Sequence, residues 1–342
     1  MRGKVLVTGG AGFIGSHLSE LLLDEGLEVF ALDDLSTGTE TNIAHLRDRE
    51  GFHLVVDSVL SPSVVSELVH RSDAVYHLAA AVGVRLIVEQ PGRTLLTNVQ
   101  GAENVLDYCA RFEKPVLVAS SSEVYGNHPE DVSLKEDALR IYGPTTAKRW
   151  AYADTKALDE FLTLALRHER GLKCVIARLF NTVGPRQNSQ YGNVVPRFVQ
   201  RALAGEPLQI HGDGTQTRCF CHVSDVVRAL KGLLDAADGE IYNVGSTDRI
   251  TIAALAHRVL EATGSSSELV FVPYEEVYEG GVAEEMFHRA PAIDKIASAI
   301  GWRPTIDLDG ILADVIAFSS EGADGQRTDR SVQTEAGQSP TS

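Results

Sequence analysis

The sequence predicts an α/β fold built on a doubly wound parallel sheet, and three observations lead to this prediction. Short apolar runs typical of buried strands alternate with helix-like segments over roughly the first 180 residues. A glycine-rich turn joins the first of these strands to the first helix. After about residue 180 the alternation loosens, which indicates a second, smaller lobe.

The expected elements follow from these patterns in order. The apolar runs of the sheet are Lys4–Thr8, Glu28–Leu32, His53–Val56, Ala74–Leu78, Pro115–Ala119 and Cys174–Leu179. Beyond them, PRFVQRALAGEP predicts a helix ended by Gly205 and Pro207, followed by a short strand, Leu208–His211. Further helices at Val223–Asp235 and Ile252–Thr263 flank a strand at Glu240–Val244. No internal repeat is visible.

These elements suggest a division of the chain. We expect residues 1–180 to form the parallel-sheet domain, with later chain excursions, and residues 181–318 to form mainly the smaller α/β lobe. From Ser319 to Ser342 the chain has almost no large apolar residues, so we expect a disordered tail there.

Composition narrows the function classes. The 342 residues are 44% hydrophobic and 23% charged, as in ordinary globular proteins. No run reaches the roughly 18 to 20 apolar residues of a membrane helix, and the chain enters a strand at once where a signal peptide would stand, so we expect a cytoplasmic protein without membrane contact. The net charge of −16 argues against nucleic acid as a partner.

The four cysteines are scattered, which favours reduced thiols over a disulfide framework. Cys219 and Cys221 with His222 raise the alternative of a metal site. Alternate residues of a strand share a face, but no second ligand cluster follows at zinc-like spacing. We therefore favour a structural role and predict no metal.

The stretch KVLVTGGAGFIG carries the nucleotide prediction. Gly9, Gly12 and Gly15 stand between a strand and a helix, where glycine lets the backbone approach a pyrophosphate at the helix N-terminus. Asp33 ends the next strand at about the expected distance and suits the ribose hydroxyls, which favours NAD over NADP; the alternative is a plain turn carboxylate. Asp57, after the third strand, is a candidate for the adenine amino group.

A second motif suggests acid–base chemistry. Tyr152 and Lys156 lie four residues apart in a helix-compatible stretch, so they share a face. A nearby ammonium stabilises phenolate, and we expect it to lower the pKa of Tyr152 towards the working pH, making the phenol a general base. The polar stretch SSSEVYG, residues 120–126, follows a buried strand, where parallel sheets gather ligands; its alternative is a strand-end cap.

Together these motifs resemble the extended short-chain dehydrogenase/reductase superfamily, and within it the nucleotide-sugar epimerases, dehydratases and decarboxylases. The resemblance runs from Lys4 to about Phe318. The stretches that carry it are TGGAGFIG, HLAA at 77–80, Asn98, SSSEVYG, YADTK at 152–156, RLFNTVGPR at 178–186, GDGTQTR at 212–218 and HVSDVVRAL at 222–230.

This resemblance implies a Rossmann domain that holds NAD tightly, a C-terminal lobe for a nucleotide sugar, and a homodimer built on helices near 92–111 and 149–169. The cofactor contacts that it adds to Gly9, Gly12, Gly15, Asp33 and Asp57 are Phe13, Ile14, Leu78, Ala79, Ala80, Asn98, Tyr152 and Lys156.

The same resemblance implies a catalytic set and a substrate set. The catalytic residues are Ser121, Glu123, Tyr152 and Lys156. The substrate contacts are Arg85, Ser122, Asn181, Arg218 and Arg289. For Arg85 a solvated loop position is an equal alternative.

The choice of reaction rests on SSSEVYG. In these families Tyr152 would take the proton of the sugar 4-hydroxyl while a hydride leaves carbon 4. Ser122 stands where a dehydratase has its acid, which argues against dehydration. Three stretches resemble the corresponding ones of UDP-glucuronate decarboxylases: SSSEVYG with its Glu123, Arg149-Trp150, and His288-Arg289-Ala-Pro291. In the last of these, Ala290 replaces the lysine that is usual there.

We therefore predict UDP-glucuronate decarboxylation to UDP-xylose or its 4-keto precursor. A 4-epimerase acting on UDP-glucuronate or UDP-glucose is the alternative. A regulatory NAD-binding protein without activity would not need Ser121, Tyr152 and Lys156, all of which are present. Two roles stay open for Glu123, a charge that raises the energy of the substrate carboxylate or a protonated hydrogen-bond donor.

Overall fold

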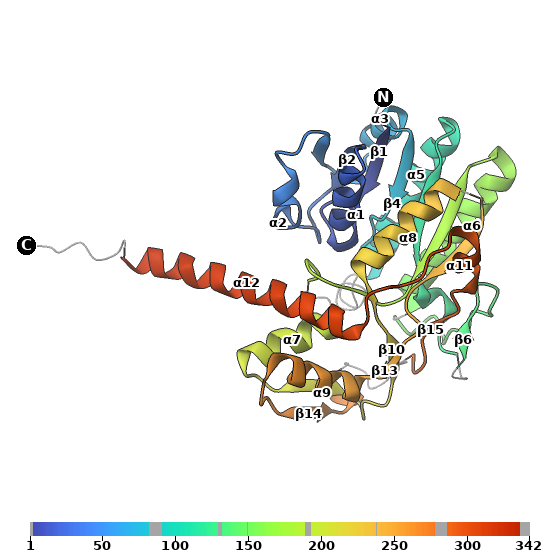
Figure 1. Cartoon of the computed structure of the whole chain (residues 1–342). Coiled ribbons are helices and arrows are strands. Elements are labelled where there is room, and N and C mark those ends of the chain that lie inside the picture. The colour runs from blue at the N-terminus through green and yellow to red at the C-terminus, as the bar shows by residue number, and fades with distance from the viewer. Residues whose placement is uncertain are drawn as a thin grey trace, which may run out of the picture.

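One seven-stranded parallel sheet organises the molecule (Figure 1). The computed structural model describes residues 3–81, 91–128, 132–148, 150–188, 193–236, 238–277 and 286–335. The strands lie in the order β12-β7-β5-β4-β1-β2-β3, and every neighbouring pair is parallel. Their bounds are β1 Lys4–Thr8, β2 Glu28–Asp33, β3 Phe52–Val56, β4 Ala74–His77, β5 Val116–Ser121, β7 Cys174–Leu179 and β12 Ile241–Val244.

The predicted α/β fold is confirmed, and its topology locates the ligand crevice. The chain runs from β1 outward through β2 and β3, and then crosses to β4 on the other side of β1. At such a reversal the connections leave the sheet in opposite directions, which opens a crevice at the carboxyl ends of the strands. The glycine-rich turn after β1 and the polar stretch after β5 both stand at this edge.

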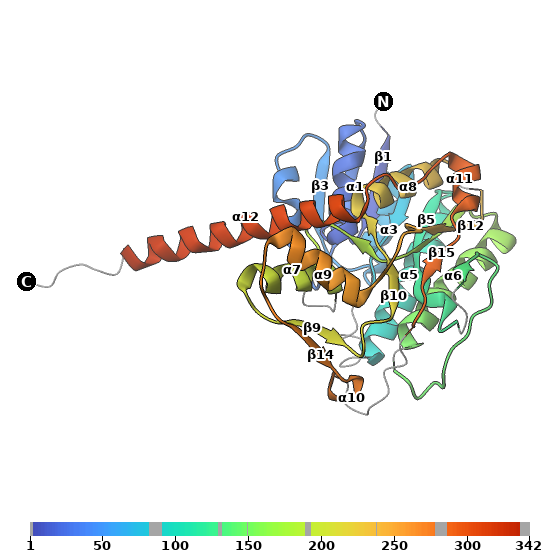
Figure 2. The ribbon, with the colours of Figure 1, turned by 60° about the horizontal axis from the view of Figure 1, so that its bottom comes forward.

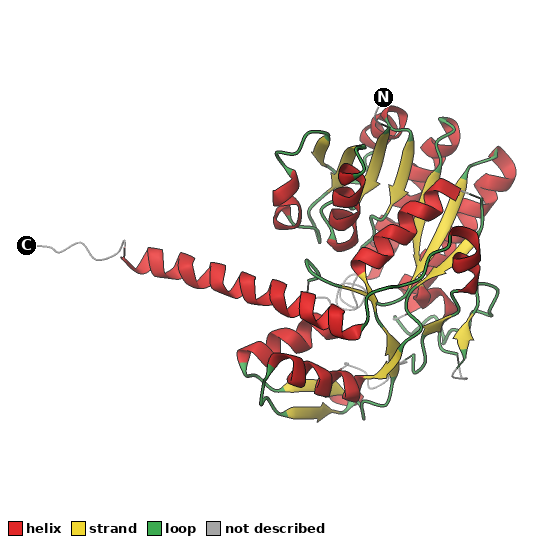
Figure 3. Ribbon diagram, in the orientation of Figure 1, coloured by secondary structure: helices red, strands yellow, loops and turns green. Residues whose placement is uncertain are grey.

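Helices cover both faces of the sheet (Figure 3). One layer consists of α3 Pro62–Arg71, α5 Pro91–Arg111 and α6 Trp150–Arg170, and the other of α1 Phe13–Asp24, α8 Val223–Ala236 and α11 Asp294–Ile300. Along β1, Leu6 packs towards the first layer, whereas Val5 and Val7 pack towards the second. Double coverage explains why the strands read as continuous apolar runs.

A smaller lobe forms below the sheet (Figure 2). Its core includes Phe198, Leu255 and Ile311, from three helices that pack with two pairs of strands. These elements are α7 Val194–Ala204, α9 Ile252–Thr263, α12 Leu308–Glu335, the parallel pair β9 Leu208–His211 with β14 Leu269–Val272, and the antiparallel pair β10 Thr217–Cys219 with β13 Arg249–Thr251.

Short elements connect the two regions. The parallel pairs are β6 Ser133–Leu134 with β15 Ala290–Pro291, and β8 Thr182–Val183 with β11 Cys221–His222. The remaining short helices are α2 Glu40–Ile43, η1 Ala44–Leu46, η2 Ser122–Tyr125 and α10 Tyr274–Val277. After residue 180 the chain returns to the large sheet as α8, β12 and α11, so the predicted strand at 240–244 belongs to that sheet. The division at residues 180 and 181 remains a prediction.

The C-terminal segment contains α12, and the disordered tail expected for residues 319–342 stays a prediction. Ile311, Leu312 and Val315 anchor the start of α12 in the lobe core, and the helix continues to Glu335, away from the body (Figure 1). No proline interrupts residues 308–335, so a helix nucleated by its buried first turns can propagate through this polar stretch.

Three further predictions concern metals, thiols and membranes. Within the described ranges, no group of three or more histidine, cysteine or acidic side chains could hold a metal ion. Cys109, Cys174, Cys219 and Cys221 are buried and unbridged. No described helix combines the length and apolar character that crossing a bilayer requires.

Gly15 tests the packing of the turn after β1. A Cβ added there would lie 2.0 Å from the Gly9 carbonyl oxygen. We expect Gly15→Ala to lower the free energy of unfolding by about 1–3 kcal/mol, because the backbone must move. The control is Gly92→Ala at an exposed position of α5, where no described atom lies within 4 Å of the added carbon apart from the chain neighbours and the nearby backbone of the same helix. Urea unfolding measures both, and equal stability of the two variants would contradict the packing argument.

His17 joins α1 to the segment after β8. Its Nε2 lies 3.0 Å from the Pro185 carbonyl oxygen, and burial lowers the pKa of His17 from 6.5 to about 4. Between these pH values the unfolded chain binds a proton that the folded chain does not, so stability falls as the pH falls through this window.

We expect His17→Gln to remove that loss. When the pH is lowered from 7 to 5, the free energy of unfolding falls in the parent. In His17→Gln this fall should be smaller by about 1–2 kcal/mol. Urea unfolding at both pH values measures this difference. Exposed His257→Gln is the control, and a His17→Gln variant with the parent's pH dependence would contradict the assignment.

Candidate active site

The glycine-rich turn and the end of β2 form one unit. The Gly9 amide donates to the Leu32 carbonyl at 2.8 Å, and Gly9 has a φ of +72°, which suits glycine. Asp33 is buried, and its Oδ2 accepts a hydrogen bond of 2.9 Å from the Ala11 amide. Burial raises the pKa of Asp33, against the opposing effect of backbone hydrogen bonds from Leu35 and Ala11.

This arrangement fits a dinucleotide. The turn packs so closely that a Cβ at Gly10 would lie 2.5 Å from the Ala31 Cβ, and Phe13 and Ile14 pack their side chains on the core, which leaves the backbone facing the crevice edge. Close backbone approach at the start of α1 is what a pyrophosphate needs, and Asp33 retains acceptor capacity beside it.

Asp57 follows β3 and has local partners. Its Oδ1 accepts hydrogen bonds from the Ser58 amide at 2.7 Å and the Ser61 hydroxyl at 2.5 Å. The Ser61 bond is the main reason why the pKa of Asp57 is lowered. The carboxylate therefore organises the turn before α3, and its proposed contact with adenine stays a prediction.

The HLAA segment, which begins at the last residue of β4, is hydrogen-bonded to β1, and the Ala81 that follows it is hydrogen-bonded to α5. The Leu78 and Ala79 amides each donate to Thr8 Oγ1 at 3.2 Å. Asn98 on α5 is buried; its Oδ1 accepts from the Ala81 amide at 2.7 Å, and its Nδ2 donates to Thr155 Oγ1 on α6 at 3.3 Å. In the described contacts Asn98 thus links this segment to the helix that carries Tyr152. Ala80 lies between these anchored residues.

Ser121 stands where β5 ends and η2 begins. Its Oγ accepts a hydrogen bond of 3.2 Å from the Glu123 amide, so it caps η2, and its side chain also hydrogen-bonds Tyr152. Ser121 therefore caps η2 and also contacts Tyr152, so the strand-end cap does not exclude the catalytic role, which stays a prediction. Ser122 is completely buried, and its Oγ has no hydrogen-bond partner among the described residues.

Tyr152 and Lys156 lie in the first two turns of α6. Lys156 lowers the pKa of Tyr152 as expected, and so does Ser121. Burial acts more strongly, and with Glu123 and Asp159 it leaves the pKa of Tyr152 raised. The expectation of a net lowered pKa is therefore wrong for this arrangement of the chain, because desolvation of phenolate outweighs one nearby cation.

Glu123, Asn181 and Arg289 form a cluster beside Tyr152. Arg289 Nη1 donates to Glu123 Oε1 at 2.6 Å, and Nη2 donates to Asn181 Oδ1 at 2.8 Å. Arg289 is nearly buried, and its Nε has no partner among the described residues. Asn181 has a φ of +31°, and its Nδ2 donates to the Cys219 carbonyl. Residues that are far apart in sequence thus meet at one place.

Of the other predicted substrate residues, the structure describes Arg218 but not Arg85. Arg218 on β10 donates from Nη1 to the Thr217 carbonyl at 2.8 Å, and Thr217 Oγ1 lies 3.3 Å from His288 Nδ1, so this strand adjoins the segment that carries Arg289. Arg85 and Arg149 lie outside the described residues.

Sequence reasoning missed two carboxylates on α6. Asp159 pairs with Lys156, Nζ to Oδ2, at 3.1 Å. Glu160 pairs with Arg178 at 2.7 Å and accepts from the Ser120 hydroxyl at 2.5 Å. The available signal was the spacing, since positions three and four residues beyond Lys156 return to its helix face.

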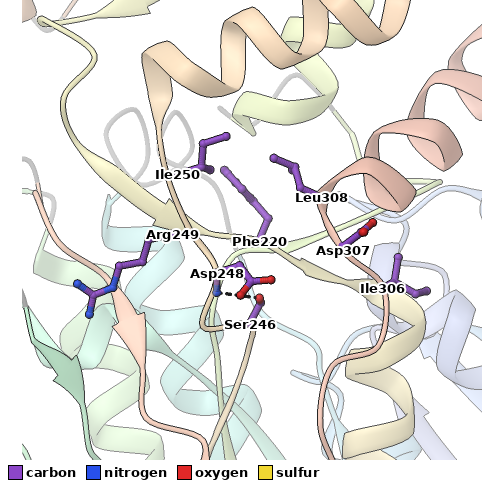
Figure 4. A pocket seen from close by; sticks show the side chains of 8 residues that line it. All are labelled: Phe220, Ser246, Asp248, Arg249, Ile250, Ile306, Asp307 and Leu308. Carbon is purple, nitrogen blue, oxygen red and sulfur yellow. Dashed lines mark hydrogen bonds between the residues drawn. The ribbon is translucent and has the colours of Figure 1, made fainter.

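A separate pocket lies near the start of α12 (Figure 4). Its volume is about 140 Å³, and it is lined by Phe220, Ser246, Asp248, Arg249, Ile250, Ile306, Asp307 and Leu308. None of the predicted catalytic, cofactor or substrate residues lines this pocket, so the crevice edge described above remains the candidate site.

Two curated relatives match nearly the whole of this chain. The UDP-N-acetyl-alpha-D-glucosaminuronate decarboxylase of Bacillus cytotoxicus is 39% identical over 94% of this chain and 99% of its own. The UDP-glucuronic acid decarboxylase 1 of Danio rerio is 33% identical over 97% of this chain and 76% of its own.

Solved structures show the same fold. The UDP-glucuronic acid 4-epimerase of Bacillus cereus, in complex with UDP-glucuronic acid and NAD, has a TM-score of 0.82 at 29% identity, covering 93% of this chain and 99% of its own. The UDP-glucose 4-epimerase of Thermotoga maritima, with UDP-glucose, has a TM-score of 0.83 at 27% identity, covering 94% and 99%.

Residues 5–245 match the model of the NAD dependent epimerase/dehydratase family. This match spans well over half of the chain, and the full-length relatives above are nucleotide-sugar enzymes. The chain therefore belongs to the NAD dependent epimerase/dehydratase family and is an NAD-dependent nucleotide-sugar enzyme, a decarboxylase or a 4-epimerase.

Proposed function

We propose that the protein decarboxylates a UDP-hexuronate. The observation that carries this proposal is the cluster of Glu123, Asn181 and Arg289, which sets beside Tyr152 a nearly buried guanidinium whose Nε has no partner among the described residues. A carboxylate is the natural ligand of a desolvated guanidinium. Named decarboxylases related over nearly the whole chain support the same reaction.

The reaction proceeds through a β-keto acid. Oxidation at carbon 4 places a ketone two carbons from the carboxylate carbon, so the bond to that carbon can break with its electron pair entering the ketone as an enolate. Carbon dioxide leaves, carbon 5 takes a proton, and reduction at carbon 4 gives the UDP-pentose. NAD, when bound, accepts the hydride from carbon 4 and supplies it again for this reduction.

The side chains of this site have distinct roles in the proposed reaction. Tyr152 removes the proton of the 4-hydroxyl and, with Ser121, donates hydrogen bonds to the carbon 4 oxygen when negative charge collects there. Lys156 stabilises the phenolate. Arg289 holds the hexuronate carboxylate, and Glu123 keeps the guanidinium in place through its hydrogen bond with Nη1.

We assign the cofactor contacts to the residues that form the crevice edge. The turn at Gly9, Gly12 and Gly15 would hold the pyrophosphate, Asp33 the adenosine ribose, and Lys156 the second ribose. The backbone of residues 78–80 and the segment anchored by Asn98 would line the cofactor, with Asp57 near the adenine. Arg218 would bind the nucleotide phosphates of the substrate.

The sugar admits two choices. UDP-glucuronate is the substrate that the sequence motifs predict, whereas the relative of 39% identity is named for the 2-acetamido form, UDP-N-acetylglucosaminuronate. That identity favours testing both sugars. The 4-epimerase alternative is supported by the epimerase structures of the same fold, among them one that contains UDP-glucuronic acid.

We further propose a cytoplasmic homodimer. Leu96 on α5 and Leu158 and Phe161 on α6 are 60%, 47% and 61% exposed, and these two helices pack side by side. An apolar surface on two adjacent helices suits an isologous interface with a second copy.

Product analysis tests the reaction. The full-length protein is incubated separately with UDP-glucuronate and with UDP-N-acetylglucosaminuronate, and the products are analysed by mass spectrometry and NMR. We expect a product lighter by one carbon dioxide from at least one sugar. A product of unchanged mass with inverted carbon 4 would replace the decarboxylase assignment with the epimerase.

The phenol of Tyr152 tests the assigned base. We expect Tyr152→Phe to lower kcat by about 10²–10⁴-fold, since it removes the proton acceptor. Binding of NAD, measured by calorimetry, should change little because the ring remains. Tyr142→Phe, a substitution outside the proposed catalytic set, is the control for removal of a tyrosine hydroxyl. Parent-like turnover by Tyr152→Phe would exclude this residue as the base.

A further inference from the structure

Asp159 and Lys156 form a buried ion pair one turn inside the catalytic helix. Their Nζ and Oδ2 atoms are 3.1 Å apart, and the side chains are only 4% and 2% exposed. A pair buried so deeply gains little net stability, because the cost of desolvating two charges offsets their attraction. Its main consequence is where it places charge relative to the substrate site.

We propose that Asp159 is a positioning residue that holds the Lys156 ammonium on α6 and offsets part of the positive charge acting on Tyr152. This inference rests on the proposed roles of Tyr152 as base and Lys156 as its cation. It adds Asp159 to that pair as a residue that acts through Lys156.

Asp159 and its neighbour Glu160 have different hydrogen-bond partners. Glu160 is committed to Arg178 on β7, through Nε at 2.9 Å and Nη2 at 2.7 Å. Asp159 accepts from Lys156 and lies on the same helix. One of the three ammonium N–H groups is thereby occupied, which limits how freely the ammonium can move towards the phenol.

The surrounding charges agree with this role. Lys156 interacts with Asp159, Tyr152 and Glu160 on its own helix and with His77 on β4, while Glu123 acts on Tyr152 from η2. Burial alone would lower the pKa of Lys156, but Asp159 is the strongest of the groups that raise it. For Tyr152, burial raises the pKa and Lys156 lowers it; the Asp159 charge acts with burial.

The sign of the effect follows. Removing the Asp159 charge takes away one of the negative charges that oppose ionisation of Tyr152, so phenolate becomes easier to form. The pH at which Tyr152 becomes a competent base should then fall. A purely structural aspartate would change the amount of active enzyme at every pH without moving this pH.

The test uses the full-length protein with bound NAD and follows hydride transfer in a single turnover, through the near-ultraviolet absorbance of the reduced nicotinamide. UDP-glucuronate and UDP-N-acetylglucosaminuronate are the two probes. In Asp159→Asn we expect the acid limb of the pH–rate profile to move down by about one pH unit, with the plateau rate within about threefold of the parent.

Two further variants separate charge from shape. Asp159→Glu keeps the carboxylate and should keep the acid limb of the parent. Asp154→Asn removes an exposed carboxylate of the same helix, one that pairs with Arg140, and should leave the profile unchanged.

An acid limb that stays in place in Asp159→Asn overturns the proposal, whatever happens to the plateau. Asp159→Ser repeats the measurement if Asp159→Asn does not fold, as judged by circular dichroism, and failure of both to fold also overturns it. Tyr152→Phe is measured in parallel: hydride transfer at the parent rate would defeat the proposed base, whereas loss of transfer with an unmoved limb in Asp159→Asn defeats only the role of Asp159.

Discussion

The buried ion pair between Glu160 and Arg178 sets the position of α6, the helix that carries Tyr152 and Lys156, against the sheet. It joins α6 to β7 by two hydrogen bonds of 2.7 and 2.9 Å, and Ser120 on β5 donates to the same carboxylate. Arg178 Nη1 also reaches the Glu136 carbonyl beside β6. Removing either charge would leave its partner buried and unpaired, which costs about 3–5 kcal/mol. The distance between Ser121 at the end of β5 and Tyr152 on α6 depends on this contact.

The sequence predicted the parts of this site that depend on local spacing. The strands before Gly9, Asp33 and Ser121 were recognisable because they are covered on both faces and therefore continuously apolar. The pairing of Tyr152 with Lys156 follows from helical spacing, which sequence reveals directly.

The features of the site that depend on tertiary packing could not be predicted from the sequence. Asp159 and Glu160 look like a solvated helix face in sequence, and only the packing of α6 on the sheet shows that they are buried. The net direction of the Tyr152 pKa depends on desolvation, which sequence does not contain. The start of α12 also depends on tertiary structure, because Ile311, Leu312 and Val315 anchor its first turns in the lobe core.

Two buried arginines, Arg178 and Arg289, differ in how many of their guanidinium nitrogens are hydrogen-bonded to the protein. In Arg178 all three guanidinium nitrogens donate to protein oxygens, so its hydrogen-bonding capacity serves the fold. In Arg289, Nη1 and Nη2 are engaged and Nε is left without a partner among the described residues. A buried donor without an acceptor is costly, and a substrate carboxylate would satisfy it. The contrast between these two side chains is the physical reason to place the hexuronate carboxylate at Arg289.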